Sequence, residues 1–271
     1  VMQTTSRDYD PAQRSRSGLS GGDAAKVEQA HQEGKSLGGD YLAAVTAEAL
    51  KTAECNACMK RIVAAPTAGS CGVLPAVLLP LARSGEADEE SICDALYVAA
   101  GFGQVIAARA TLAGAEGGCQ AEVGIASAMA ASAAVELMGG DPQQCLDAAS
   151  TVLMNMLGLV CDPVGGLVEY PCQNRNAAGV ANALIAAELS LSGIRQLIPF
   201  DQMLDAMYAV GKRLPAELRE TALGGCAATP AACAACGDKN SFCFEHIDSS
   251  VVFIFFLFLR FAIRSVQRPS L

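Results

Sequence analysis

Between residues 116 and 176 the chain reads EGGCQAE (116–122), GLVCDPVGG (158–166) and EYPCQNRN (169–176). Each string holds one cysteine, and the three are Cys119, Cys161 and Cys172. Each cysteine lies beside glycine or proline and next to residues that start helices, so the strings predict corners between helices. A cysteine at such a corner can point its sulfur into a space shared by several corners, away from the seams where helices pack.

The composition of the whole chain favours helices. The chain has 271 residues, 52% of them hydrophobic, which is enough to bury a large core in one domain or in two smaller ones. Alanine and glycine are abundant, tryptophan is absent and aromatic residues reach only 5%, as expected for closely packed helices and not for a β-sandwich or barrel. We therefore predict an all-α, multi-helix fold.

The charge of the chain argues against two classes of partner. The formal net charge is −9, the pI is about 4.8, and no cluster of lysine and arginine interrupts the acidic surplus. Such a field repels nucleic acid and anionic membrane surfaces. We expect small-molecule chemistry instead.

The twelve cysteines lack the spacing of a small secreted disulfide domain. The N-terminal residues are polar, with Arg7, Arg14 and Arg16, and show no apolar segment of a signal peptide. We expect a reducing, cytoplasmic compartment in which most thiols stay free. A cysteine cluster in that setting indicates metal or redox chemistry.

Composition divides the chain into three regions. Residues 1–22 are polar and form either an arm that docks on the rest of the chain or a frayed terminus. Residues 23–230 carry helical patterns and form the main domain. Residues 231–271 form a tail that is rich in cysteine and phenylalanine.

Apolar residues at helical spacing predict helices through most of the main domain. Asp23 can cap the first helix. The others are expected over 41–61, up to Leu81 after a turn at 65–75, over 92–112, 120–138 and 142–157, from Asn174 or Asn176 to Leu191, and as two shorter helices within 200–222. The segment 120–138 has small residues on nearly every face, which places it at the centre of the bundle.

The turn APTAGSCGVLP (65–75) is the second informative stretch. Pro66 stops the preceding helix, and Thr67 or Ser70 can cap the next one. A helix start offers free N–H groups and the positive end of a dipole, which suit a carboxylate. Alternatively, the small residues serve only a tight turn.

One cysteine pair lies inside a predicted helix. Cys55 and Cys58 form a CxxC among alanines, and we interpret them as core packing. Their distance along the chain from Cys233 and Cys236 gives no specific zinc-site spacing.

The three corner cysteines are 42 and 11 residues apart, so only the fold can bring Cys119, Cys161 and Cys172 together. They form either an iron–sulfur site with three thiolates or a set of buried structural cysteines.

Six strings occur in the order typical of a known family: RSGLSGGDA (16–24), RIVAAPTAGSCGVLPAVL (61–78), EGGCQAEVG (116–124), GLVCDPVGG (158–166), EYPCQNRN (169–176) and LRETALGG (218–225). Over roughly residues 14–230 the chain resembles the α chain of the iron–sulfur-dependent L-serine dehydratases. This resemblance implies a mostly helical α-chain domain with a [4Fe–4S] cluster and no pyridoxal phosphate. It also implies a lyase that degrades L-serine to pyruvate and ammonia.

The resemblance places the cluster ligands at Cys119, Cys161 and Cys172. Three cysteines leave one iron of a cubane open, as a Lewis acid toward the serine hydroxyl while a base removes the α-proton. An open iron also predicts sensitivity to oxygen.

The substrate carboxylate needs hydrogen-bond donors. The candidates are Thr67, Gly69 and Ser70 in the turn, and Asn174, Arg175 and Asn176 in the EYPCQNRN string. Arg175 is alternatively an ordinary surface or helix-start arginine.

The general base is not assigned by the sequence. His31 and His246 both lie outside the six strings. Family members have a β domain, either fused or as a separate chain, with an anion-binding string that this chain lacks. We therefore expect a separate β chain as partner, in a hetero-oligomer.

The resemblance ends near Pro230. Seven of the nine phenylalanines lie at or beyond Phe242, and the apolar run 251–263 is too short to span a bilayer comfortably. The tail is a membrane-edge or partner-docking helix, a buried core element, or sequence translated past a frameshift or a wrong gene boundary, and the abrupt change in composition favours the last. In some relatives a C-terminal cysteine fills the fourth cluster position; the stand-ins here are Cys226, Cys233, Cys236 and Cys243.

Two rival functions remain open. One is a non-catalytic iron–sulfur subunit that senses oxygen or iron, and the other is a chain that only binds its partner.

Overall fold

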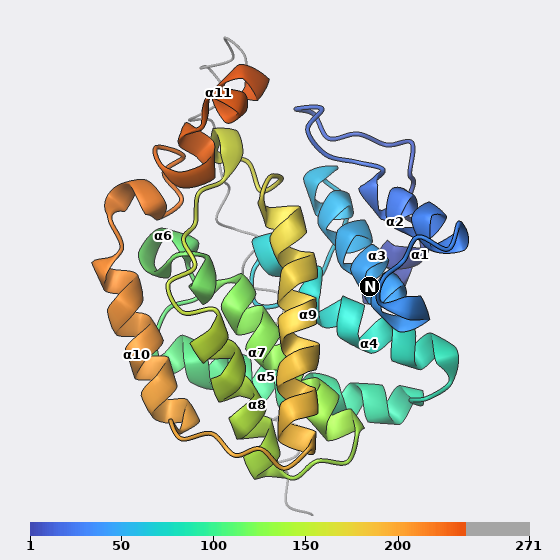
Figure 1. The fold of residues 1–271 in the computed structure, drawn as a ribbon, viewed down its shortest axis with the longest axis vertical. Coiled ribbons are helices and arrows are strands. Elements are labelled where there is room, and N and C mark those ends of the chain that lie inside the picture. The colour runs from blue at the N-terminus through green and yellow to red at the C-terminus, as the bar shows by residue number, and fades with distance from the viewer. Residues whose placement is uncertain (237–271) are drawn as a thin grey trace, which may run out of the picture.

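The helix α7 (Val123–Leu137) forms the centre of the bundle in the computed structural model, which describes residues 1–236. Every residue from Val123 to Val135 is buried. The helices α5 (Glu89–Arg109), α8 (Pro142–Asn155) and α9 (Cys172–Leu191) pack around it (Figure 1). The central position predicted for 120–138 is confirmed, because its small side chains let neighbours approach on all sides.

The described residues form eleven α-helices and five short 3-10 helices, and they contain no β-strand, which confirms the all-α prediction. The other α-helices are α1 (Met2–Arg7), α2 (Asp23–Gln32), α3 (Gly39–Ala57), α4 (Val73–Ser84), α6 (Gly114–Gly117), α10 (Phe200–Arg213) and α11 (Pro230–Cys236). The 3-10 helices are η1 (Ala68–Ser70), η2 (Cys119–Ala121), η3 (Val164–Gly166), η4 (Ala216–Leu218) and η5 (Gly225–Ala228).

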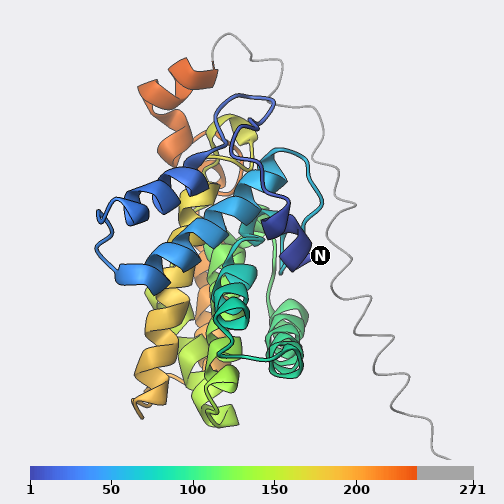
Figure 2. The ribbon, with the colours of Figure 1, turned by 90° about the vertical axis from the view of Figure 1, so that its right-hand side faces the viewer.

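The N-terminal helices cover one side of the bundle. α3 packs on α9, and α4 packs on both α7 and α9. Figure 2 looks onto this side and shows α2 lying along the outer face of α3. The first 57 residues therefore extend the bundle by a further layer.

The corner loops gather at one end of the molecule. Residues 158–171 run over the end of the bundle where α9 begins, and α10 leads η4 and η5 back to the same end (Figure 1). Segments far apart in the sequence can therefore contribute to one site.

Three helix starts differ from the sequence expectation. Gly22, and not Asp23, is the capping residue of α2. Thr67 and Ser70 cap the short η1, so that α4 begins after Gly72. α9 begins at Cys172, before Asn174 and Asn176, because the carbonyls of Glu169 and Pro171 already accept from the amides of its first turn.

The run 251–263, His246 and Cys243 lie outside the described residues. Within 1–236, α5 is the one helix whose length and composition would allow it to cross a membrane. Its inner face, with Ala95, Ala99 and Ile106, is buried against the bundle.

Candidate functional site

The first corner is tied to the second by a buried glutamine. Cys119 follows Gly118 and starts η2, and its side chain is buried. The next residue, Gln120, accepts from the amide of Gly158 through Oε1 at 2.8 Å and donates through Nε2 to the carbonyl of Met207 at 2.8 Å. Its own amide donates to the carbonyl of Leu159 at 3.0 Å. The side chain of Gln120 thus holds the Cys119 corner against the loop that leads to Cys161.

The second corner is held by the LRETALGG string. The amide of Cys161 donates to the carbonyl of Leu218 at 2.9 Å, and the amide of Glu220 donates to the carbonyl of Cys161 at 2.7 Å. These bonds form an isolated parallel bridge between Cys161 and Arg219. The backbone of Cys161 is therefore fixed from a segment almost 60 residues later in the chain.

An ion pair joins the second corner to the start of α9. Arg175 Nη1 lies 2.7 Å from Asp162 Oδ1, and it also donates to the carbonyl of Val160 at 2.9 Å. Asp162 is buried and accepts from the amide of Cys226 at 2.6 Å. One nitrogen of the guanidinium, Nη1, thus contacts both Asp162 and the backbone before Cys161.

The third corner is linked to the 65–75 turn. Cys172 is the first residue of α9 and is half-buried. Asn176, one turn later and fully buried, donates through Nδ2 to the carbonyls of Cys172 and Gly69, each at 2.8 Å. Its Oδ1 accepts from the amide of Gly72 at 2.9 Å. Both N–H groups and the oxygen of this amide take part in hydrogen bonds, so Asn176 fixes the turn to α9.

A glutamate that the sequence analysis did not single out lies between the turn and the second corner. Glu122 Oε2 is 3.7 Å from Cys161 Sγ, and Thr67 donates a hydrogen bond to the same carboxylate. Burial, and after it the charge of Glu220, raise the pKa of Glu122 to about 7, while the bonds from Thr67 and Cys161 oppose the shift. A Cβ at Gly114 would lie 2.6 Å from Glu122 Oε2 and 2.9 Å from Cys161 Sγ, so the backbone of Gly114 closely approaches both side chains.

The three corner thiols interact electrostatically. Burial is the main cause that raises the pKa of each thiol, and it brings the pKa of Cys119 to about 12. After burial, Cys119 and Cys172 also raise the pKa of Cys161, and Cys119 raises that of Cys172, so the charges of the three interact with one another. The three cysteines that the sequence singles out therefore lie close enough for their charges to affect one another.

This donor set fits an iron–sulfur group. Three neighbouring thiolates need positive charge. Arg175 lowers the pKa of both Cys119 and Cys172, and the amide of Val123 also lowers that of Cys119. Iron–sulfur clusters are held by cysteine thiolates, and iron would supply that charge. In addition, ligand atoms of Glu122, Cys161 and Glu220 lie within 4.8 Å of one another.

The other candidates lie at the edges of the site or away from it. Asn174 is exposed on α9, and His31 lies on α2 with its Nε2 3.4 Å from Asp40. Cys226 interacts with Asp162, and Cys233 is exposed. The sulfur of Cys236 lies 3.0 Å from where a Cβ of Gly165 would be. Their predicted roles are not tested by these positions.

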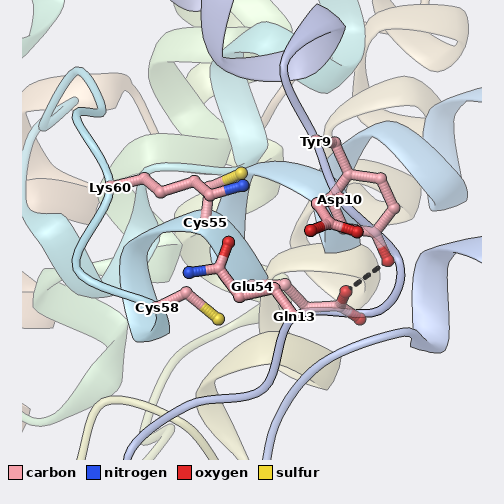
Figure 3. Close-up of a pocket in the computed structure, with 7 residues that line it drawn as sticks. All are labelled: Tyr9, Asp10, Gln13, Glu54, Cys55, Cys58 and Lys60. Atoms are coloured by element: carbon pink, nitrogen blue, oxygen red, sulfur yellow. Dashed lines mark hydrogen bonds between the residues drawn. The ribbon is translucent and has the colours of Figure 1, made fainter.

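An open groove of about 380 Å³ borders the site. It lies between the end of α8 and α9, with Arg175 among its lining residues. The Cys55–Cys58 pair lies apart from it, at the end of α3 (Figure 3). There Cys55 is buried with its thiol 3.7 Å from the carbonyl of Thr5, and Cys58 is half-buried.

The chain is similar to known proteins of one family. The family model described as "Serine dehydratase alpha chain" matches residues 1–227. The chain is 50% identical over 216 residues to the "Probable L-serine dehydratase, alpha chain" of Bacillus subtilis (strain 168), covering 80% of this chain and 72% of that protein. It is 52% identical over 206 residues to the "L-serine dehydratase, alpha chain" of Peptoniphilus asaccharolyticus, covering 76% and 70%.

A longer relative gives the same result. The "L-serine dehydratase 2" of Escherichia coli (strain K12) is 41% identical over 187 residues, which are 68% of this chain but only 41% of that protein. Proteins with this name are lyases, and the resemblance drawn from the six strings is confirmed. The chain belongs to the serine dehydratase alpha-chain family.

Proposed function

We propose that this chain is the α chain of an L-serine dehydratase, an ammonia-lyase that converts L-serine to pyruvate and ammonia without pyridoxal phosphate. The proposal is supported by one observation above all. In a chain of this family, the thiols of Cys119, Cys161 and Cys172 affect one another's charge, with the Glu122 carboxylate 3.7 Å from the Cys161 sulfur and Arg175 acting on Cys119 and Cys172.

Cys119, Cys161 and Cys172 would hold a [4Fe–4S] cluster. Its chemical contribution, when bound, is a Lewis-acidic iron that assists departure of the serine hydroxyl. The chain supports this ligand set through Gln120, the 218–220 segment and Asn176, which each fix one corner. Arg175 adds a positive charge beside the thiolates.

The substrate would lie between the 67–70 turn and the start of α9. Its candidate binding groups are Thr67, Gly69 and Ser70, in the turn that contacts Glu122, and Asn174, Arg175 and Asn176, in the first turns of α9. Backbone amides and an arginine suit the substrate carboxylate. Asn176 contributes by fixing the turn, because both N–H donors of its amide group are already used within the chain.

A separate β chain would complete the enzyme in the cytoplasm. The relatives named as alpha chains imply a second kind of chain, and the one histidine within 1–236, His31, lies outside the site. We therefore assign the general base to the β chain of a hetero-oligomer.

The test is to reconstitute the chain with iron and sulfide under anaerobic conditions, together with its β chain, and to measure pyruvate from L-serine. We expect turnover, and an electron paramagnetic resonance signal of the reduced cluster that shifts when L-serine is added. Cys119→Ser, Cys161→Ser and Cys172→Ser should each lower the iron content and abolish turnover, whereas Cys93→Ser, an exposed cysteine on α5, should change neither. A cluster without a serine-dependent shift would favour the non-catalytic iron–sulfur subunit. Absence of a cluster would favour a chain that only binds its partner.

A further inference from the structure

Two serines in the segment RSRSGLSGG (14–22) point toward the interior of the protein. The hydroxyls of Ser15 and Ser17 each donate to Glu169 Oε2 at 2.7 Å, across more than 150 residues of sequence. Ser15 is buried, as is Glu169. A loop near the N-terminus thus reaches the EYPCQNRN string directly.

The loop is shaped to deliver both hydroxyls to one oxygen. The amide of Ser15 donates to the carbonyl of Ser20 at 3.0 Å, and the amide of Gly18 donates to the carbonyl of Ser15 at 3.0 Å. The amide of Leu19 donates to Ser17 Oγ at 3.0 Å. These bonds close residues 15–20 into a compact turn with its two serines on the inner side.

The other end of the loop is anchored on α3. The carboxylate of Glu54, buried on that helix, accepts from the amides of Gly22, Asp23 and Ala24 at 2.7 to 3.1 Å. It also accepts from the hydroxyl of Tyr9 at 2.6 Å, a bond drawn in Figure 3. Residues 15–24 are therefore held at both ends, by Glu54 and by Glu169.

Glu169 lies at the start of the helix that carries Cys172. Its carbonyl accepts from the amide of Gln173 at 3.0 Å, which closes the first turn of α9. The carbonyl of its neighbour Tyr170 accepts from the amide of Val164 at 2.8 Å, which ties this corner to the loop after Cys161. A shift of the Glu169 backbone would therefore also displace Tyr170 and Gln173, which lie on either side of Cys172 in the chain.

We propose that residues 15–24 form a strap that positions the Cys172 corner, with Ser15 and Ser17 acting through Glu169. The strap is a positioning element, because its side chains bond to the carboxylate and not to the thiol. The inference deepens the proposed function by assigning a role to a family string that lies outside the cysteine corners. It rests on that function only in so far as Cys172 serves as a ligand.

The test measures how fast the thiol of Cys172 reacts in the iron-free, full-length chain. Iodoacetamide labelling of each cysteine is followed over time by mass spectrometry in wild type and in the double variant Ser15→Ala/Ser17→Ala. We expect the labelling rate of Cys172 to rise about tenfold, because local opening of the corner becomes easier when Glu169 loses both donors. The rate of Cys145, which is buried in α8, should not change.

Three further variants show whether the serines act through Glu169. Glu169→Ala should speed Cys172 labelling to a similar extent, and adding the serine substitutions to it should have no further effect. Ser17→Thr keeps the hydroxyl and should behave as wild type. The matched control is Ser36→Ala/Ser192→Ala, in which Ser36 bonds only a nearby carbonyl and Ser192 is exposed.

The proposal is overturned if Cys172 labels at the wild-type rate in Ser15→Ala/Ser17→Ala, or if all buried cysteines speed up together, since the latter would mean general destabilisation. The variants Ser15→Ala/Ser17→Ala and Glu169→Ala, reconstituted with iron, should retain less iron than wild type after gel filtration. The labelling experiment needs neither L-serine as substrate nor bound iron. A failed dehydratase assay would therefore leave the strap proposal standing, and a failed labelling test would leave the dehydratase proposal intact.

Discussion

Gln120 shows how one buried side chain can join the Cys119 corner to the loop before Cys161 and to α10. It is fully buried, and its amide group bonds the amide of Gly158 and the carbonyl of Met207. Gln120→Met keeps the approximate shape but leaves both backbone groups unpaired. We expect the free energy of unfolding of the iron-free chain to fall by about 1–3 kcal/mol, measured by urea denaturation. The control is Gln104→Met on the exposed face of α5, and equal midpoints for the two variants would contradict this account.

The ion pair between Arg175 and Asp162 makes a second prediction. Asp162 is almost fully buried, so Arg175→Met would leave an uncompensated charge beneath the second corner. We expect a loss of about 3–5 kcal/mol of unfolding free energy. Adding Asp162→Asn should recover much of that loss, because the double variant removes the charge as well as its partner. A double variant as unstable as Arg175→Met alone would show that the guanidinium stabilises the fold through other contacts.

The contact between α7 and α9 depends on a glycine. A Cβ at Gly179 would lie 2.6 Å from Ser127 Oγ and 2.7 Å from Val123 Cγ1. Gly179→Ala should therefore destabilise the chain by about 1–3 kcal/mol through overpacking, although alanine is the better helix former. Gly101→Ala on α5 is the matched control, since nothing lies within 4 Å of its added Cβ. We expect this control to raise the free energy of unfolding by up to about 1 kcal/mol, and with it the melting temperature. The two variants should therefore shift the melting temperature in opposite directions.

The helices could be predicted from the sequence more fully than their ends. Apolar spacing places α3, α5, α7 and α8 within a few residues of their observed bounds, because that spacing reflects which face is buried. The start of α9 was misjudged because asparagine is a strong capping signal, whereas here backbone carbonyls from the preceding loop accept from the first turn. Capping by the backbone leaves no trace in residue type.

The site could be predicted only where family strings mark it. Cys119, Cys161 and Cys172 were singled out from their settings and the resemblance. Glu122 and Glu220 were not, although each lies inside a string, because nothing in a sequence shows that carboxylates almost 100 residues apart approach the same sulfur. The inward direction of Ser15 and Ser17 was equally hidden, since serines in a polar, glycine-rich segment also suit a frayed terminus.

Across the whole chain, burial of free thiols predicts how stability depends on pH. Three cysteines away from the corners have pKa values raised chiefly by burial from 9.0, Cys55 and Cys145 to about 11 and Cys71 to about 12. A raised pKa means that the folded chain keeps these protons while the unfolded chain releases them. Their contribution is therefore complete below pH 9 and is lost progressively as the pH rises from 9 toward 11 or 12.

We therefore expect the free energy of unfolding of the iron-free chain to be nearly constant between pH 7 and 8 and to fall between pH 9 and 10.5. Each buried thiol should contribute about 1.4 kcal/mol per pH unit to the slope once its unfolded form is ionised. Urea denaturation at intervals of 0.5 pH unit under reducing conditions measures the slope. Cys145→Ala should reduce it by one such contribution, whereas Cys93→Ala, at an exposed position, should leave it unchanged. A stability that stays level up to pH 10.5 would mean that the thiols ionise as readily in the folded chain as in the unfolded one, and the buried positions assigned to them would then be wrong.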